Sequence, residues 1–512
     1  MKPLDIRKIS GKKFYEECIK NRAPYLTRAR EAAELTKPSL YPKDGQEGNS
    51  YPNPYQSLGA RGVNNLANKI VMTQLPPNNT FFKAKIPKSI LAEMGKTPDE
   101  IKPAMGLIEQ EVIEEMEESM LRSKLIYATE LNLVGGSYII KVPDEGEPII
   151  YRLDQFGVRR DKQGNVLKMC IQECLRFSSL PETLQNNFPK ELDNDAVRND
   201  EKDITIYTCI IRHGNKYVTF QTIENFTINE TRAEYPLDYC PYKFVPFIDR
   251  GGDFGRSYLE DYMGDLESLE GLRKSTLEAS AEAARVIYLL SPNATISVKR
   301  LQEAKSGDVL TGSETDISLL NSNSKVTDLQ ITQAEVANLR QDLSSIFLLD
   351  SAVRRNAERV TAEEIRIVAQ ELEVAMGGVY STQSKSQKEL VKLYIKRCID
   401  KGSIPRDFIG ILKAEIITGV AALGRGSEFS SLNTFLTTLQ NTIGPENYLS
   451  LINRRNIINK LAYSLGLNPN EITMTEDELA KQQAQAQVAN QQQLIDEAAA
   501  PVIAQQAMNG EQ

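Results

Sequence analysis

The feature that most constrains the fold is one stretch, residues 257–290, whose pattern predicts a single continuous helix. Ser291-Pro292-Asn293 ends it. At 1.5 Å per residue, about 34 residues would extend for roughly 50 Å. Its first half carries an apolar stripe, and its second half carries small residues that include Ala279, Ala283 and Ala284. Small side chains let helices approach closely, so we expect the second half to pack against other helices. The alternative is a surface helix that uses alanine for its helix propensity.

Length and composition limit the class of protein. A chain of 512 residues exceeds one hydrophobic core, so two to four domains are expected. The net charge of −8 argues against a protein that coats nucleic acid, although it allows brief contact with DNA. No apolar run approaches the ~18 residues of a membrane helix, and the basic N-terminus lacks the apolar core of a signal peptide. We therefore expect a soluble protein of the cytoplasm or of a cytoplasmic assembly.

The cysteines and the histidine predict no metal site and no cofactor. The six cysteines are scattered, and we expect them to be reduced thiols. Cys170 and Cys174 have the spacing of a metal-binding pair, but no second pair follows and His213 is the only histidine. We expect these two cysteines to lie in or beside a strand as small, partly buried groups.

The hydrophobic pattern changes period along the chain and predicts a mixed α+β fold that is mainly α-helical. Helices are expected over residues 12–40 (with a break at Pro24 and a stop at Pro38), 55–75 and 106–134, the last closed by Gly135-Gly136. From 137 to about 249 the runs are β-rich and separated by turn dipeptides, which predicts a small, mostly antiparallel region. A polar interruption at 181–203 is expected to be a surface loop.

Beyond residue 290 the predicted elements are shorter. Residues 294–330 contain strand-like runs, and a helix is expected over 332–349. A strand is expected near 414–420, and the tail from 475 is rich in glutamine and alanine, which predicts a polar helix up to Pro501 and disorder beyond.

A basic segment joins the 332–349 helix to the next one. It carries Arg354, Arg355 and Arg359 and runs into a helix signalled by Thr361 as N-cap and Glu364 three residues later. Two interpretations stay open from this segment alone. The arginines pair with neighbouring carboxylates in a solvated loop, or the loop contacts a polyanion.

The motifs of common enzymes are incomplete in this chain. Gly95-Lys96-Thr97 imitates the end of a Walker A loop, but Ile90 stands where that loop needs glycine. Asp253-Phe254-Gly255 imitates the kinase metal loop without a preceding HRD triplet. His213 has no GxSxG partner motif. We expect no catalytic residues and no enzymatic activity.

The order of helix, insert, helix, loop and helix, with VTAEEI opening the last, resembles the portal proteins of tailed bacteriophages. It resembles in particular the portal, or head-to-tail connector, of short-tailed (podovirus-type) phages. The matching motifs span most of the chain in one order: RAPYLTRA (22–29), PSLYPKD (38–44), PYQSLGARGVNNLANKI (54–70), GRSYLEDYMGDLESLEGL (255–272), GDVLTG with DISLL (307–320), ERVTAEEIR with ELEVAMGGVYS (358–381) and TGVAALGRG (418–426).

This resemblance implies a portal fold that assembles as a ring, normally of twelve copies, at one capsid vertex. It implies the following parts: wing (1–256), first stem helix (257–290), clip (291–331), second stem helix (332–349), tunnel loop (350–360), long wing helix and returning strand (361–427), crown (428–474) and a Gln/Ala-rich barrel helix with a flexible tail (475–512).

The resemblance also implies a function and partners. Double-stranded DNA would pass through the ring during packaging and ejection, and the tail would attach to it. The implied partners are the terminase, tail adaptor and nozzle proteins, and scaffold, major capsid and internal core proteins, with no membrane. The protein would be found in the virion, and in the host cytoplasm during assembly.

Residue roles follow from the same resemblance. Arg354, Arg355 and Arg359 would contact DNA, and the alanines of the first stem helix would pack in the ring. Twelve copies at −8 give about −96, whereas three arginines per chain place about 36 positive charges in one ring. Contact with the terminase or adaptor would fall to the clip residues Lys299, Arg300 and Lys305.

Two other functions are weighed against this one. The first is a non-ring scaffolding or DNA-binding structural protein of a phage, which predicts monomers or dimers and a basic surface. The second is a hydrolase with a degenerate motif, which predicts turnover.

Overall fold

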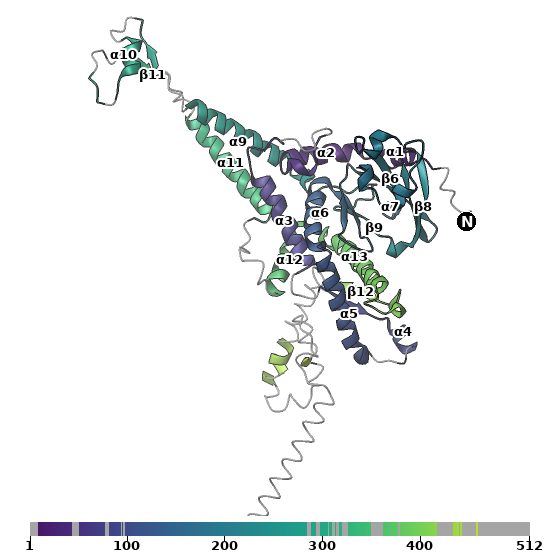
Figure 1. Cartoon of the computed structure of the whole chain (residues 1–512). Coiled ribbons are helices and arrows are strands. Elements are labelled where there is room, and N and C mark those ends of the chain that lie inside the picture. The colour runs from purple at the N-terminus through teal and green to yellow at the C-terminus, as the bar shows by residue number, and fades with distance from the viewer. Residues whose placement is uncertain are drawn as a thin grey trace, which may run out of the picture. The chain divides into compact units, whose positions relative to one another are not determined.

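The chain divides into two compact units, of which the first comprises residues 1–90 and 108–420 and the second residues 91–107 and 421–512. A computed structural model (Figure 1) describes residues 9–43, 51–76, 81–93, 98–283, 288–292, 297–305, 326–349, 362–376 and 379–416, together with Gly95 and short pieces within 307–319 and 434–458.

More of the described residues lie in helices than in strands, which confirms a mixed α+β fold. The described helices are α1 (Gly11–Ile19), α2 (Ala23–Glu34), α3 (Leu58–Gln74), α4 (Lys88–Glu93), α5 (Pro98–Glu118), α6 (Leu121–Gly135), α7 (Glu182–Asn186), α8 (Asp195–Arg198), α9 (Met263–Ala283), α10 (Val298–Glu303), α11 (Val326–Ile346), α12 (Ala362–Met376) and α13 (Val379–Lys401).

The strands pair antiparallel throughout the described residues. A five-stranded sheet has the order β4-β5-β6-β7-β8, a three-stranded sheet the order β3-β2-β9, and β1 pairs with β12 and β10 with β11. The strands are β1 (Phe82–Lys85), β2 (Ser137–Lys141), β3 (Ile149–Tyr151), β4 (Phe156–Arg160), β5 (Val166–Leu175), β6 (Ile204–His213), β7 (Lys216–Ile223), β8 (Phe226–Pro236), β9 (Tyr242–Pro246), β10 (Tyr288–Leu290), β11 (Ile317–Leu319) and β12 (Lys413–Ile416).

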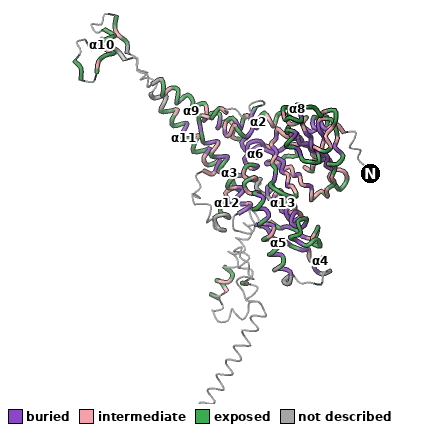
Figure 2. Tube along the Cα trace, in the orientation of Figure 1, coloured by how far each residue is buried: buried purple, intermediate pink, exposed green. Residues whose placement is uncertain are grey.

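A continuous apolar core joins helices α2, α3, α6, α9, α11 and α12 to strands of the two larger sheets. It includes Leu66 of α3, Leu131 of α6, Ile139 of β2, Leu266 of α9 and Leu372 of α12, all fully or almost fully buried. Figure 2 shows buried residues along α6 and α13, whereas the short helix α10 is exposed. Apolar residues of α3, α6 and α12 therefore face this core.

The predicted helix over 12–40 divides at its expected breaks. α1 ends at Ile19, Pro24 lies in the first turn of α2, and Pro38 begins a 3₁₀ turn after α2 has ended. Arg22 fixes the junction because its Nη1 donates to the carbonyl oxygens of Asp154 and Phe156, each at 2.8 Å.

Two of the sequence predictions, for residues 106–134 and 181–203, were wrong. The single helix over 106–134 is two helices, α5 and α6, separated at Met120, whose φ of 56° interrupts the helical hydrogen bonds. The surface loop predicted over 181–203 contains α7 and α8. Leu184 and Val197 are buried against strands β6 to β8, so this segment covers apolar surface on the sheet.

Gly136 closes α6 as the sequence predicted, and its backbone requires glycine. Its φ is +79°, its N–H donates to Asn132 O at 2.8 Å, and its carbonyl accepts from Phe247 N at 2.8 Å. A Cβ atom there would lie 2.6 Å from Gly255 O and from the carbonyl carbon of Arg256. The positive φ and the lack of space both exclude a side chain.

Gly136→Ala should therefore lower the free energy of unfolding by well over the ~1 kcal/mol that positive φ alone costs alanine. The matched control is Gly146→Ala, because Gly146 has φ +82° but open space around it. Urea unfolding followed by far-UV circular dichroism measures both. Equal shifts of the two midpoints would contradict the packing argument.

Candidate functional site

Helices α9 and α11 form an antiparallel pair (Figure 1). Leu266 and Leu269 of α9 are buried with Val336 and Leu343 of α11. The hydroxyl of Tyr258, just before α9, donates to Ile346 O at the end of α11 at 3.1 Å. Strand β10 follows α9 and pairs with β11, which precedes α11. The chain therefore runs from the apolar core to this strand pair along α9 and back to the core along α11. We call α9 and α11 the helix hairpin.

The prediction of one helix over 257–290 was wrong at both ends. Ser257 Oγ accepts from Leu259 N at 3.0 Å and starts a 3₁₀ turn, Leu259–Asp261, so the α-helix begins only at Met263. At the other end Tyr288–Leu290 form strand β10, which fits the β-branched and aromatic residues in this part of the sequence. The second helix begins at Val326, six residues before its predicted start and inside the predicted clip.

The outer half of the helix hairpin leaves apolar side chains uncovered in the single chain. Leu277 is 45% exposed and Ile331 is 66% exposed. Ala279 is half-buried, while Ala283 lies in α9 without a described side-chain environment and Ala284 lies outside the described residues. The structure therefore does not test the close packing predicted for the small residues.

The basic residues predicted for partner contact lie on or beside α10. Ser297 caps this helix by accepting from Arg300 N at 3.4 Å, and Lys305 N donates to Asp308 Oδ2 at 2.8 Å. Lys299, Arg300 and Lys305 are all exposed. Val309, close to them in sequence, is 95% exposed, so basic and apolar groups share this short piece.

Helix α11 ends in a Schellman motif with an unusual residue. Leu348 takes the left-handed conformation with φ 51°, where glycine is usual. Leu348 N donates to Ser345 O at 3.1 Å, and Leu349 N donates to Ser344 O at 2.8 Å. A left-handed non-glycine residue costs roughly 1–2 kcal/mol, so other contacts must stabilise it.

Those contacts come from one face of α3. Asn65 Nδ2 donates to Phe347 O at 2.9 Å and to Leu348 O at 3.0 Å, and Lys69 Nζ donates to Leu348 O at 2.8 Å. A Cβ atom on Gly62 would lie 2.3 Å from Phe347 Cγ, so the ring of Phe347 rests directly on the α3 backbone. Gly62, Asn65 and Lys69 have the spacing of one helix face. We call these three residues the α3 cradle.

The electrostatics of the cradle follow from its burial. Partial burial lowers the pKa of the Lys69 ammonium, and the nearby Glu371 carboxylate of α12 acts in the opposite direction. Val368, Leu372 and Met376 of α12 belong to the same core as α3. Helix α3 therefore packs against both helices that flank the basic segment.

Arg354, Arg355 and Arg359 lie outside the described residues, as does Thr361. Sequence reasoning missed Asn65 and Lys69, because their partners lie about 280 residues further along the chain. The available signal was the spacing of Asn65 and Lys69 on one face of α3.

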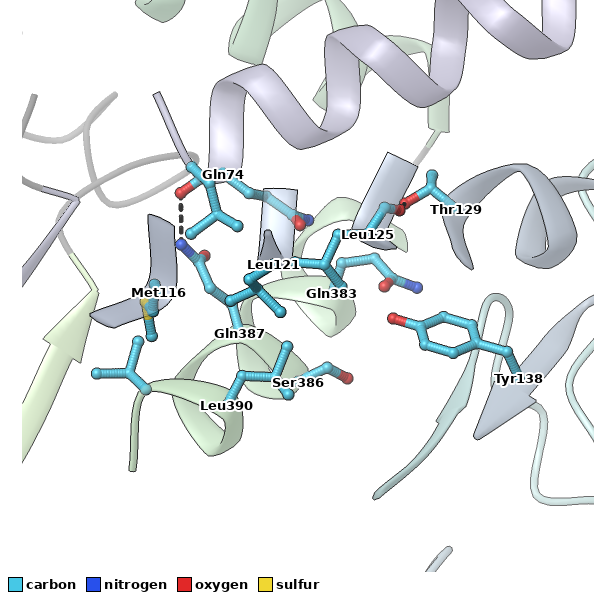
Figure 3. Close-up of a pocket in the computed structure, with 12 residues that line it drawn as sticks. Gln74, Met116, Leu121, Leu125, Thr129, Tyr138, Gln383, Ser386, Gln387 and Leu390 are labelled. Atoms are coloured by element: carbon cyan, nitrogen blue, oxygen red, sulfur yellow. Dashed lines mark hydrogen bonds between the residues drawn. The ribbon is translucent and has the colours of Figure 1, made fainter. Parts of the chain in front are cut away.

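Two cavities lie elsewhere in the first unit. One of about 20 Å³ lies among α3, α5, α6 and α13, where Gln387 Nε2 donates to Gln74 O at 2.5 Å (Figure 3). The other, of about 280 Å³, is walled by Thr208, Thr219 and Thr231. The hydroxyls of Thr208 and Thr231 accept hydrogen bonds from Gln221, which leaves this wall internally paired.

The described ranges contain no metal-binding cluster and no helix that could span a membrane. Within them, no three His, Cys, Asp or Glu side chains converge as metal ligands. None of the helices there combines the length and the apolar character that crossing a bilayer requires. Cys170 lies in β5 with its Sγ 3.6 Å from Cys209 Sγ, and burial raises the pKa of the Cys170 thiol.

Comparison with known proteins identifies the family. The sequence model described as "Bacteriophage head to tail connecting protein" matches residues 11–472. The chain belongs to this family. The portal protein of Escherichia phage T7 is 33% identical over 503 residues, covering 96% of this chain and 92% of that protein. The portal protein of Enterobacteria phage T3 is 32% identical, covering 91% and 89%.

A more distant relative and a solved structure are also similar to this chain. The portal protein of Enterobacteria phage SP6 is 25% identical, covering 83% of this chain and 82% of that protein. A solved structure titled "Neck of native GTA particle computed with C12 symmetry" has a TM-score of 0.35 and 10% identity, covering 81% of this chain and 90% of that one. At that TM-score the structural likeness carries no weight here.

The burial of the helix hairpin generates a stability prediction. Leu269→Ala should cost about 2–5 kcal/mol, because it leaves a cavity between α9 and α11. Leu277→Ala is the matched control on the same helix, and in the unassembled chain it should change stability by less than about 0.5 kcal/mol. Denaturant unfolding at low protein concentration compares them. Equal losses would show that the pair is not packed as described.

Proposed function

We propose that this chain forms the portal of a short-tailed phage: a ring, of twelve copies, at one capsid vertex. Double-stranded DNA passes through the ring during packaging and ejection, and the tail attaches to it. The observation that carries this proposal is the family match over residues 11–472, with portal proteins at 33% and 32% identity across nine-tenths or more of the chain.

The described elements support an assignment of parts. The helix hairpin is the stem, and β10, α10 and β11 belong to the clip. Residues 1–256 form the wing, together with α12, α13 and strand β12 in 361–427, and residues 350–360 form the tunnel loop. Residues 428–474 form the crown, and 475–512 the barrel helix and tail. The uncovered Leu277 and Ile331 support this assignment, because a neighbouring subunit in a ring would cover them.

Charge supports the conduit role. A channel should not grip its cargo, and a ring of acidic chains repels DNA as a whole. Against that background the tunnel-loop arginines make weak, salt-sensitive contacts with the phosphate backbone. Such contacts hold DNA without regard to sequence, because base edges are not involved.

The proposed partners follow from this position in the particle. The terminase binds the clip during packaging, through Lys299, Arg300 and Lys305, and tail adaptor and nozzle proteins bind there afterwards. Scaffold, major capsid and internal core proteins contact the remaining surfaces. The chain has a structural role in the virion, reached by assembly in the host cytoplasm, and we propose no catalytic activity of its own.

Reversing the tunnel-loop charge tests the DNA contact. Arg354→Glu, Arg355→Glu and Arg359→Glu together should leave rings intact but reduce packaged or retained DNA, because phosphates would then face carboxylates. The matched control reverses three exposed wing residues, Lys162, Lys190 and Lys202, for the same change in net charge. DNA content per purified head measures both. Normal DNA-filled heads from the arginine variant would refute the contact.

The stem assignment makes a second prediction. Ala283→Trp should reduce ring yield, because a bulky side chain does not fit between closely packed helices. Ala283→Ser is the matched control and should assemble normally. Size-exclusion chromatography with light scattering measures ring yield. Rings forming from the tryptophan variant at the control yield would count against close packing at this position.

A further inference from the structure

We propose that Asn65 and Lys69 of the α3 cradle are positioning residues for the tunnel loop. They hold the end of α11 in its left-handed cap and so fix where the chain leaves the stem toward the arginines. The consequence for DNA rests on the function proposed above, whereas the structural role of the two residues does not.

The first step is the number of donors that converge on one helix end. The last carbonyls of a helix have no intrahelical partner. Here the Tyr258 hydroxyl donates a hydrogen bond to Ile346 O. The Asn65 amide donates to the carbonyl oxygens of Phe347 and Leu348, and the Lys69 ammonium also donates to Leu348 O. Two of these three donors come from α3, which is remote in sequence.

The second step is that the conformation needs this support. Leucine at the left-handed position is strained where glycine would not be, and strained residues persist only where surrounding contacts fix them. The ring of Phe347 rests on Gly62 and prevents the end of α11 from moving toward α3. The two side-chain donors of the cradle prevent it from moving away.

The third step is that α12, the helix at the other end of the loop, also contacts α3. Helix α12 packs on α3, and its Glu371 carboxylate interacts with the Lys69 ammonium. The two flanks of the basic segment therefore share α3 as a common support. Removing the cradle's donors should loosen the α11 end without unfolding α3, whose apolar face is buried separately through Val63, Leu66 and Ile70.

A local measurement tests the cradle in the full-length protein. Asn65→Asp, which replaces the amide donor with an acceptor, and Lys69→Met should each raise hydrogen exchange in peptides covering residues 344–353 about tenfold. Asn68→Asp is the matched control, because Asn68 is exposed on α3 and donates only within its own helix, to Asn64 O. Unchanged exchange in both cradle variants would overturn the inference.

Two further variants separate positioning from general stability. Lys69→Arg keeps a donor and should restore most of the protection. Leu348→Gly removes the strain, so Lys69→Met should raise exchange less in that background than in the natural sequence. An equal rise in both backgrounds, or no rescue by arginine, would show that the cradle does not act through the left-handed cap.

DNA content per head then distinguishes the two proposals. We expect the cradle variants and the triple arginine variant all to lose DNA while rings still form. Normal DNA in the cradle variants, with loss in the arginine variant, would overturn the positioning role alone. Raised exchange in the cradle variants, with normal DNA in the arginine variant, would overturn the DNA contact and leave the cradle's structural role standing.

Discussion

The close contact of Phe347 with Gly62 attaches the helix hairpin to α3, a helix that is itself part of the main core. The ring of Phe347 lies where any side chain on Gly62 would stand. Through this contact the helix hairpin joins α3, and through Leu66 and Ile70 the same helix joins the core shared with α6 and β2. A long two-helix projection is thus attached to a packed body over a short length, and the polar donors of the cradle complete that attachment.

Local features were predictable from the sequence where one residue type has one strong preference. Pro24 and Pro38 marked the ends of helices, Gly136 closed α6, and the alternating runs between 137 and 249 became antiparallel strands. The break at Met120 was not predictable, because methionine favours helix and no local residue signals its left-handed backbone. The adjacent Ser119 hydroxyl is buried in a hydrogen bond with Tyr394, a partner remote in sequence. Strand β8 carries a weaker local signal, because it is an edge strand whose charged side chains resemble a loop.

Contacts between residues far apart in the chain could not be predicted from the sequence. The α3 cradle depends on residues about 280 positions apart, and nothing local to Asn65 or Lys69 indicates their partners. The basic segment, by contrast, was visible at once as a local charge pattern. Its contact with DNA stays a prediction, whereas the structure shows which side chains of α3 hold the preceding helix end in place.

Assembly into a ring of twelve copies sets the mass of the protein in solution. Mass photometry of the purified full-length protein should show a dominant species of about 688 kDa, which is 12 × 57.3 kDa. A ring would also explain how Leu277 and Ile331 become covered. A protein that remains a monomer or dimer at every concentration tested would rule out ring assembly, and would favour a non-ring scaffolding or DNA-binding protein.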